Sequence, residues 1–392
     1  MMRCKSSIVI LSISYLFLAL GVNGSAKKSS LLDPNSILKT IESVDGEVID
    51  CVDIYKQPAF SHPRLANHTL QMRPSSYPIG LKPKSIFASG GNSSEEVKFQ
   101  KWHKNGEYCP EGSIPIVTSL AGDFPEKKTH PFSFSTNTVT PAGSKAEYAA
   151  AFFPGSGFHG AMGDINIWNP NTKEKEQSAA QLWVTDGEGE NIDTIEAGWT
   201  VSTYTNHPTL FVYWTADDYK TTGCYNMGCP GFVQTNHKIA LGAFLDPAST
   251  YGGQQLFVSI LIYRDDQNGN WWFNIQGQDV GYWPPDIFNG GLKGTASLLE
   301  WGGEIVNSNP GGIHTATGMG SGHFPSEGYG KAAWFKNLKY ISDGGREVRD
   351  AKGITPYATK PNCYDIEVKD WDTDMEVHFY FGGPGYSSTC QN

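Results

Sequence analysis

From about residue 145 onward, hydrophobic and polar residues alternate in short runs that are rich in β-branched and aromatic side chains. Such runs, separated by turn residues, predict β-strands. The clearest are 179–185 (AAQLWVT), 193–203 (DTIEAGWTVST), 209–214 (TLFVYW) and 255–263 (QLFVSILIY). Asn268-Gly269 separates the last of these from NWWFNIQ and predicts a β-hairpin. Because no strand–helix alternation is present, we expect an all-β fold, an antiparallel β-sandwich of two sheets.

The part of the chain before residue 140 has a mixed pattern with many Pro and Lys residues. Asp33-Pro34 can begin a helix, and apolar residues follow at helical spacing (Ile37, Leu38, Ile41 and Val44). A strand is expected around 112–118, whereas 124–144 has no clear period and is the predicted linker. We therefore expect a smaller mixed α/β propeptide module at 25–140, followed by the sandwich domain at 141–392.

The first residues have the order of a targeting signal. Arg3 and Lys5 precede an apolar run at 8–22, and small residues follow at 24–26. This order predicts a secretory signal peptide over 1–24, and the run is too short for a stable membrane span. We expect a secreted, extracellular protein with no membrane attachment after signal cleavage. The 40 acidic residues outnumber the 30 basic ones, and the basic face that nucleic-acid binding needs is not evident.

The cysteines point to disulfides. Six remain after the predicted signal peptide: Cys51, Cys109, Cys224, Cys229, Cys363 and Cys390. An even number in an oxidising compartment predicts disulfides; many pairings are open, and sequence proximity favours 51–109, 224–229 and 363–390. Paired Cys-x2-Cys spacings for zinc are missing, so we expect no metal site. Asn67 and Asn92 begin N-glycosylation sequons.

Familiar nucleophile and metal motifs are missing from the sequence. Gly-x-Ser-x-Gly does not occur, and 318–323 (GMGSGH) has the wrong spacing for a nucleophile elbow. His-Glu-x-x-His is also absent, and His314 and His323 lie nine residues apart in a Gly-rich stretch. We therefore expect neither a Ser or Cys nucleophile nor a cofactor.

Two glutamates inside predicted strands are more informative, although a strand Glu usually faces water. Glu196 shares its strand face with Gly198. Glu304 shares its face with Gly302 and Glu300. A glycine beside a carboxylate allows another backbone to approach, which suits a substrate groove. Two carboxyl groups in one site do not easily both ionise, so such a pair supplies a general base and a general acid.

Several longer blocks resemble plant neprosin-family proteins. They are 148–170 (YAAAFFPG…GAMGDINIWNP), 195–199 (IEAGW), 213–236 (YWTADDYKTTGCYNMGCPGFVQTN), 269–273 (GNWWF), 281–284 (GYWP), 300–308 (EWGGEIVNS) and 318–337 (GMGSGHFPSEGYGKAAWFKN). The stretches 50–68 (DCVDIYKQPAFSHPRLANH) and 109–116 (CPEGSIPI) resemble the activation-peptide region of that family. The resemblance covers, in order, nearly all of the chain after the predicted signal peptide.

The resemblance implies an extracellular glutamic peptidase that is made as a zymogen and cleaves after proline in acid. It also implies a β-sandwich whose concave sheet holds two catalytic glutamates. The first falls on Glu196 in IEAGW. The second lies in EWGGE, where we favour Glu304 over Glu300 because Glu304 follows two glycines.

The resemblance further implies partners and side chains around this pair. The substrates would be proline-containing peptides or proteins, and the chain's own propeptide would be an internal partner. The family disulfides would match Cys224–Cys229 and Cys363–Cys390. Four aromatic residues are candidates for an apolar slot that takes a proline ring, although each fits an ordinary core or rim position equally well: Trp199, Trp214, Tyr282 and Trp283.

Two other functions are compatible with the same pattern. A glycoside hydrolase also uses two carboxyl groups, and their separation, which decides its mechanism, is not written in the sequence. A catalytically inactive, cell-wall-associated binding protein could share the fold. The presence of both IEAGW and WGGE favours the peptidase.

Overall fold

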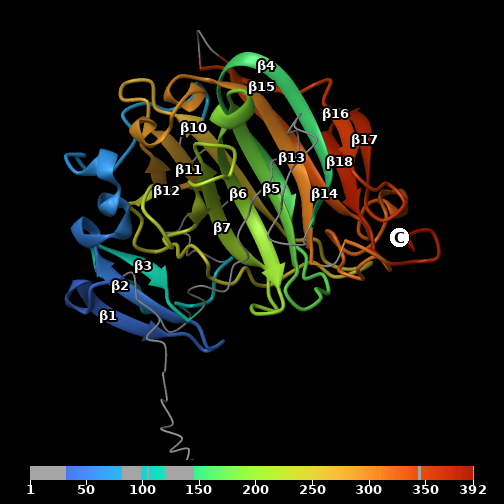
Figure 1. Cartoon of the computed structure of the whole chain (residues 1–392), viewed down its shortest axis with the longest axis horizontal. Helices are drawn as coiled ribbons and strands as arrows, with labels where there is room; N and C mark the ends of the chain where they lie inside the picture. Colours follow the sequence, from blue (N-terminus) through green and yellow to red (C-terminus); the bar gives the residue numbers. More distant parts are fainter. Residues whose placement is uncertain are drawn as a thin grey trace, which may run out of the picture. The chain divides into compact units, whose positions relative to one another are not determined.

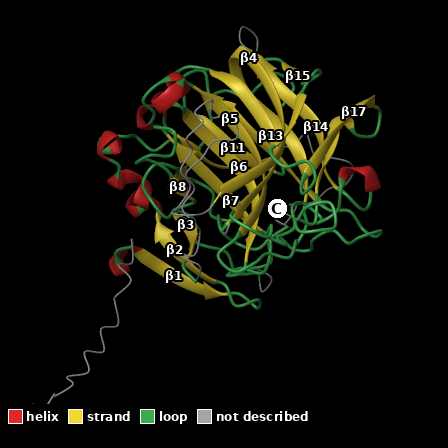
Figure 2. Ribbon diagram, turned by 45° about the vertical axis from the view of Figure 1, so that its right-hand side comes forward, coloured by secondary structure: helices red, strands yellow, loops and turns green. Residues whose placement is uncertain are grey.

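The computed structural model of the chain describes residues 32–81, 99–103, 106–119, 145–308, 310–342 and 346–391. The predicted signal peptide, the predicted linker at 124–144 and Asn92 lie outside the described residues. Strands dominate the described part (Figure 2). The helical segments there are short 3-10 turns: η1 (Pro34–Ser36), η2 (Ile54–Lys56), η3 (Pro58–Ser61), η4 (Pro63–Leu65), η5 (Gly189–Asn191), η6 (Pro285–Ile287), η7 (Gly291–Lys293) and η8 (Pro325–Glu327). No helix within these ranges is long and apolar enough to cross a membrane.

The N-terminal module, by which we mean the described residues before 120, contains a three-stranded antiparallel sheet. Its strands are β1 (Ile37–Glu42), β2 (Val48–Asp53) and β3 (Ser113–Val117), in that order. The strand expected around 112–118 is confirmed by β3. The Cys51–Cys109 disulfide ties β2 to the segment that leads into β3.

The helix predicted after Asp33-Pro34 is wrong. Only the single 3-10 turn η1 forms, and β1 follows it directly. Ile37 and Ile41 are four residues apart, a spacing that fits one face of a helix and equally one face of a strand. Pairing decides the outcome, because Ile41 lies opposite Ile49 of β2 and both are buried. The described part of the N-terminal module is therefore a small β-sheet with 3-10 turns and not a mixed α/β unit.

The rest of the described chain forms one antiparallel network of fifteen strands. Its main path runs β8 (Cys224–Tyr225), β7 (Thr209–Thr215), β6 (Asp193–Ser202), β5 (Gln177–Asp186), β13 (Ala296–Asn307), β4 (Lys145–Asn166), β10 (Phe257–Arg264), β11 (Trp271–Ile275), β12 (Gln278–Trp283) and β9 (Val233–Gln234). Off this path lie β14 (Ala333–Ser342), β15 (Val348–Asp350), β16 (Thr355–Ala358), β17 (Asp365–Asp372) and β18 (Glu376–Gly382). The four strand runs and the Asn268-Gly269 hairpin are thus confirmed, in β5, β6, β7 and β10–β11.

The long strand β4 joins two layers (Figure 1). Its first part pairs with β13, and its last part, from Gly160 on, pairs with β10 and β14. Gly160 has a φ of +150°, and a Cβ there would lie 2.2 Å from the carbonyl oxygen of Ile262. Glycine therefore allows the strand to turn from one layer into the other. The fold is antiparallel and all-β as expected, but the two expected sheets are one curled, half-barrel sheet.

Alternate side chains of this sheet fill the space between the layers. Leu182 and Trp199 of the first layer lie in the same buried cluster as Ile262 and Trp272 of the second. The indole nitrogen of Trp199 also donates to the carbonyl oxygen of Asn166 at 2.9 Å. Because side chains alternate along a strand, the other set on β5, β6 and β13 faces away from this core.

The N-terminal module shares that core. Val52 and Ile114 belong to the same buried cluster as the layers. The side chain of Gln57 donates to the carbonyl oxygen of Gln234 at 3.1 Å and accepts from its backbone N–H at 2.8 Å, as a neighbouring strand would. Residues Leu31–Asn392 accordingly cluster as one compact unit, with β1 and β2 in blue and β3 in teal in Figure 1.

Candidate active site

Strand pairing places the predicted glutamates in defined rows on the outward face of the first layer. Trp183 of β5 pairs with Glu196 of β6 on one side and with Glu300 of β13 on the other. Gln181, two positions before Trp183 on β5, pairs with Gly198 and with Gly302. We call these three residues the Gln181 row. A strand face is defined by this two-residue period, so both rows lie on the same face.

Glu304 lies in the next row of the same face. It pairs with Ala179 of β5 and with Tyr148 of β4. The Gln181 row therefore separates Glu196 from Glu304, and the glycines on either side of Gln181 add no side chains there. Glu196 and Glu304 border this row from opposite sides.

The two glycines of the middle row are required by the sheet itself. A Cβ on Gly198 would lie 2.0 Å from the carbonyl oxygen of Ala180, and one on Gly302 would lie 2.5 Å from that of Ala149. The close backbone in each case belongs to the neighbouring strand. Glycine thus permits the tight curl, and the shallow row around Gln181 follows from it.

Glu196 is buried and is held by two hydroxyl groups. The Tyr219 hydroxyl donates to its Oε1 at 2.6 Å, and the Thr194 hydroxyl donates to the same oxygen at 3.1 Å. Burial, together with the nearby charge of Glu196, raises the pKa of the Tyr219 phenol well above its ordinary value. The Tyr219 hydroxyl therefore keeps its proton and remains a hydrogen-bond donor to Glu196.

Glu304 is also buried and has a different donor. The side-chain amide of Gln181 donates to its Oε2 at 2.7 Å, and the Tyr148 hydroxyl lies 3.5 Å from its Oε1. Gln181 is not evident as a site residue from the sequence alone. Its parity with Trp183 in AAQLWVT shows that the two share a face, but only the pairing of β5 with β13 reveals that Gln181 reaches Glu304.

Glu300 is buried on the same face but belongs to another environment. The Thr185 hydroxyl lies 3.5 Å from its Oε2, and Trp183 is the residue between it and Glu196 in the strand register. Of the two candidates in EWGGE, Glu304 is thus the one that borders the Gln181 row.

The four aromatic residues predicted for a proline slot lie elsewhere. Trp199 and Trp214 point into the core between the layers, on the face opposite to Glu196. Tyr282 and Trp283 belong to β12 of the second layer, and the Tyr282 hydroxyl lies 2.7 Å from Nε2 of His68 in the N-terminal module. The structure does not bring these four rings together with the glutamates.

Other aromatic rings line the carboxylate face instead. Trp183 separates Glu196 from Glu300, and Tyr213 pairs with Glu196 from β7. The Tyr213 ring stacks on Tyr219, with ring centroids 5.8 Å apart. Their strand parity with Glu196 was the signal that could have identified Trp183 and Tyr213.

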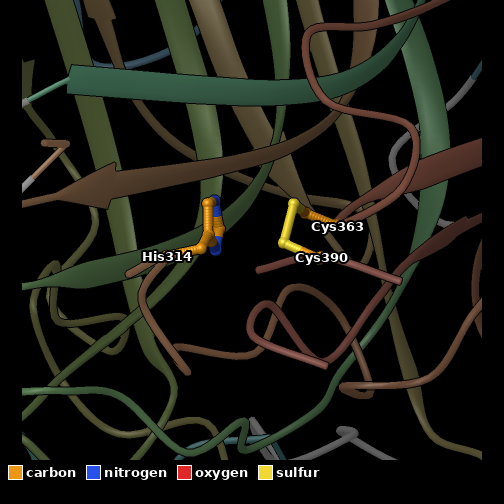
Figure 3. Close-up of side chains that lie close together, drawn as sticks. All are labelled: His314, Cys363 and Cys390. Atoms are coloured by element: carbon orange, nitrogen blue, oxygen red, sulfur yellow. A yellow bond between two sulfur atoms is a disulfide. The ribbon is translucent and has the colours of Figure 1, made fainter. Parts of the chain in front are cut away.

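One His/Cys cluster lies within metal-binding distance but does not fit a metal. Ligand atoms of His314, Cys363 and Cys390 lie within 4.8 Å of one another (Figure 3). The two sulfur atoms form a disulfide and therefore offer no thiolate. Both ring nitrogens of His314 are engaged, with Glu147 at 2.8 Å and with the carbonyl oxygen of Thr315 at 2.9 Å.

The described cysteines pair as sequence proximity suggested. The bonds are Cys51–Cys109, Cys224–Cys229 and Cys363–Cys390. The second closes a short loop directly after the turn that carries Tyr219. Asn67 lies exposed after η4, and its glycosylation stays a prediction.

Comparison with known proteins gives two family matches. The model of the Neprosin family matches residues 174–384, and that of the Neprosin activation peptide matches residues 40–151. The first match contains both Glu196 and Glu304.

Solved structures show weaker likenesses. Scytalido-glutamic peptidase with a peptide-based transition-state analogue is 12% identical over 62% of this chain and 100% of that chain, with a TM-score of 0.35. SCP-B, a member of the eqolisin family of peptidases in complex with the tripeptide Ala-Ile-His, has the same identity and coverage and a TM-score of 0.33. A homodimeric agglutinin from chicken liver, CG-16, is 8% identical over 40% of this chain and 93% of that chain, with a TM-score of 0.23. Likenesses at this level say nothing about activity.

Proposed function

This chain belongs to the neprosin family, and we propose that it is the zymogen of a secreted glutamic endopeptidase that cleaves after proline in acid. The observation that carries the proposal is the placement of Glu196 and Glu304 on opposite sides of the Gln181 row. Each carboxyl group has a neutral donor of its own, the Tyr219 hydroxyl or the Gln181 amide. The match to the Neprosin activation peptide supports synthesis as a zymogen.

The chemistry follows from two carboxyl groups that share one substrate. The ionised carboxylate accepts a proton from a water molecule, whose oxygen then attacks the peptide carbonyl carbon. The neutral carboxyl group donates a hydrogen bond to the developing oxyanion and then transfers its proton to the leaving nitrogen. One of the two groups must stay protonated, which favours activity in acid.

The shallow middle row suits this reaction. The row is buried in the full chain, so we propose that an extended substrate reaches the sheet between Glu196 and Glu304 only after the activation peptide has left, where Gly198 and Gly302 carry no side chains to obstruct it. The Gln181 amide is fixed by its bond to Glu304 and lies in the same row. We propose that the scissile carbonyl binds above this row, between the two carboxyl groups.

The test is direct. The purified full chain is incubated at acidic pH with a peptide that contains one proline and with a matched peptide that has alanine in its place, and the products are identified by mass spectrometry. We expect cleavage after proline, no cleavage of the alanine peptide, and loss of cleavage in Glu196→Gln and Glu304→Gln.

Two outcomes would contradict the proposal. Unchanged cleavage by both glutamine variants would exclude the glutamic mechanism. No peptide cleavage, with hydrolysis of a polysaccharide or with polysaccharide binding only, would favour the glycoside hydrolase or the inactive binding protein.

A further inference from the structure

The turn that carries Tyr219 is strained. Asp218 and Tyr219 have φ values of +54° and +59°, so two consecutive non-glycine residues adopt the left-handed conformation. Such residues cost free energy and persist only where the surrounding structure imposes them. The turn connects β7 to β8 within the block 213–236.

A polar network at the base of the turn imposes this conformation. The carboxylate of Asp217 accepts from the backbone N–H groups of Lys220 at 3.2 Å and Thr221 at 2.9 Å, and from the hydroxyl of Thr222 at 2.6 Å. The Thr215 hydroxyl oxygen accepts from the backbone N–H of Tyr219 at 3.0 Å. These hydrogen bonds hold the turn on both sides of Tyr219 and thereby fix its backbone.

This arrangement fixes the position of the Tyr219 hydroxyl group. The Tyr219 side chain is buried, and its hydroxyl lies 2.6 Å from Oε1 of Glu196 and 3.2 Å from the hydroxyl of Thr194. Along β6, the next residue on the face of Glu196 is Gly198, which offers no side chain to pack against the carboxyl group. Glu196 is fully buried, with Trp183 and Tyr213 paired on either side. Within this packing, the hydrogen bonds from Tyr219 and Thr194 set the direction of its carboxyl group.

We propose that Tyr219 is a positioning residue for Glu196, and that the strained turn exists to hold its hydroxyl against that carboxyl group. The inference rests on the proposed peptidase function. A tyrosine that merely fills the core would need neither the left-handed turn nor a short bond to a glutamate. The distinction is measurable because a donor to a carboxylate favours its ionised form.

The test is Tyr219→Phe, which keeps the ring and removes the hydroxyl. We expect kcat for the proline peptide to fall about 10- to 100-fold, the effect of losing one hydrogen bond to a charged group, while KM changes little. The limb of the pH–rate profile that Glu196 controls should move to higher pH. Movement of the acid limb would identify Glu196 as the base, and movement of the alkaline limb would identify it as the acid.

The matched control is Tyr364→Phe. Tyr364 is also buried, and its hydroxyl donates to the carbonyl oxygen of Thr317 at 2.8 Å, remote from the glutamates in sequence and pairing. This variant should keep the wild-type kcat and pH profile. Thermal unfolding of both variants shows whether any loss of stability is comparable.

A wild-type kcat and pH profile for Tyr219→Phe would overturn the inference and leave a packing role only. If Tyr219→Phe does not fold, Asp217→Asn loosens the turn but keeps the phenol, and an unshifted profile there would overturn the inference equally. If the wild-type chain cuts neither peptide, the proposed function fails and the inference fails with it.

Discussion

Glu196 and Glu300 lie in the same register row of the curled sheet, with Trp183 between them. Two inter-strand spacings put their Cα atoms about 10 Å apart, whereas Glu304 lies about 13 Å further along β13. Separation alone would therefore favour Glu300 as the partner of Glu196. In register, however, a tryptophan lies between Glu196 and Glu300, whereas the row that Glu196 and Glu304 border holds Gln181 and two glycines.

The first prediction follows from this relationship. Glu304→Gln should abolish cleavage of the proline peptide, because a carboxamide can neither accept nor give up the proton that this position transfers in the reaction. Glu300→Gln should keep kcat/KM within about threefold of wild type, since a change remote from the transition state alters its free energy little. Steady-state kinetics on both variants, with thermal unfolding to verify the fold, measures this. An inactive Glu300→Gln beside an active Glu304→Gln would reverse our assignment within β13.

Much of the sheet was predictable from local pattern, and so were the two candidate glutamates, but not the side chains that lie between them. Alternation identified β5, β6, β7 and β10, and strand parity placed Glu196 with Gly198. The spacing of Ile37 and Ile41 fits both periods, so only pairing with β2 could decide against a helix. The order β6-β5-β13 is a long-range property, and it alone reveals that Trp183 and Gln181 lie between the glutamates.

The second prediction concerns how the N-terminal module is held. The carboxylate of Asp265 accepts from the backbone N–H of Ser75 at 2.6 Å, the side chain of Gln71 at 2.9 Å and the hydroxyl of Ser76 at 2.8 Å. Burial alone would raise the pKa of Asp265, but these donors outweigh it and hold the pKa below the ordinary value. Its stabilisation is therefore full above the ordinary Asp pKa and is lost as the pH falls through the lower folded-state value.

Asp265→Asn removes this charge at every pH. We expect the N-terminal module to loosen at higher pH than in the wild type, so that added protease cuts within 71–76 under conditions where the wild type stays intact. Intact-mass time courses across a pH series measure this. Asp374→Asn, at an exposed turn, is the control and should behave as the wild type. Identical cleavage profiles for Asp265→Asn and wild type would show that this carboxylate does not hold the module.

The third prediction concerns a buried ion pair outside the site. Nδ1 of His314 lies 2.9 Å from the carbonyl oxygen of Thr315, and Nε2 lies 2.8 Å from the carboxylate of Glu147, so both ring nitrogens face acceptors. Burial would raise the pKa of Glu147, but His314 and Lys360 outweigh it and lower the pKa. The pair therefore stabilises the fold above the ordinary Glu pKa and loses this effect as the pH falls through the folded-state value.

His314→Gln should accordingly lower the free energy of unfolding by about 3 kcal/mol at neutral pH, because it removes the hydrogen-bonded partner of a buried carboxylate and leaves Lys360, 3.7 Å away, as the remaining cation beside it. The difference from wild type should shrink in acid, once Glu147 is protonated in both proteins. Urea unfolding at pH 7 and at strongly acidic pH measures both values. His323→Gln is the matched control, because its partner Glu327 lies near the surface. Equal losses for His314→Gln at both pH values would contradict the ion pair.

The last prediction tests whether the middle row is shaped by glycine. A Cβ on Gly198 would lie 2.0 Å from the carbonyl oxygen of Ala180, so Gly198→Ala must push β5 away from β6. Overpacking of this kind costs about 1–3 kcal/mol. Gln181 lies on β5 directly opposite Gly198, so the shift should also disturb its bond to Glu304. We therefore expect Gly198→Ala to be less stable and to lose at least about tenfold in kcat/KM, since small misplacements of reacting groups cost this much.

The control is Gly311→Ala, where a Cβ meets nothing within 4 Å, and it should keep both stability and kcat/KM. A Gly198→Ala protein with wild-type activity would show that the curl at this row does not set the distance between the two carboxyl groups.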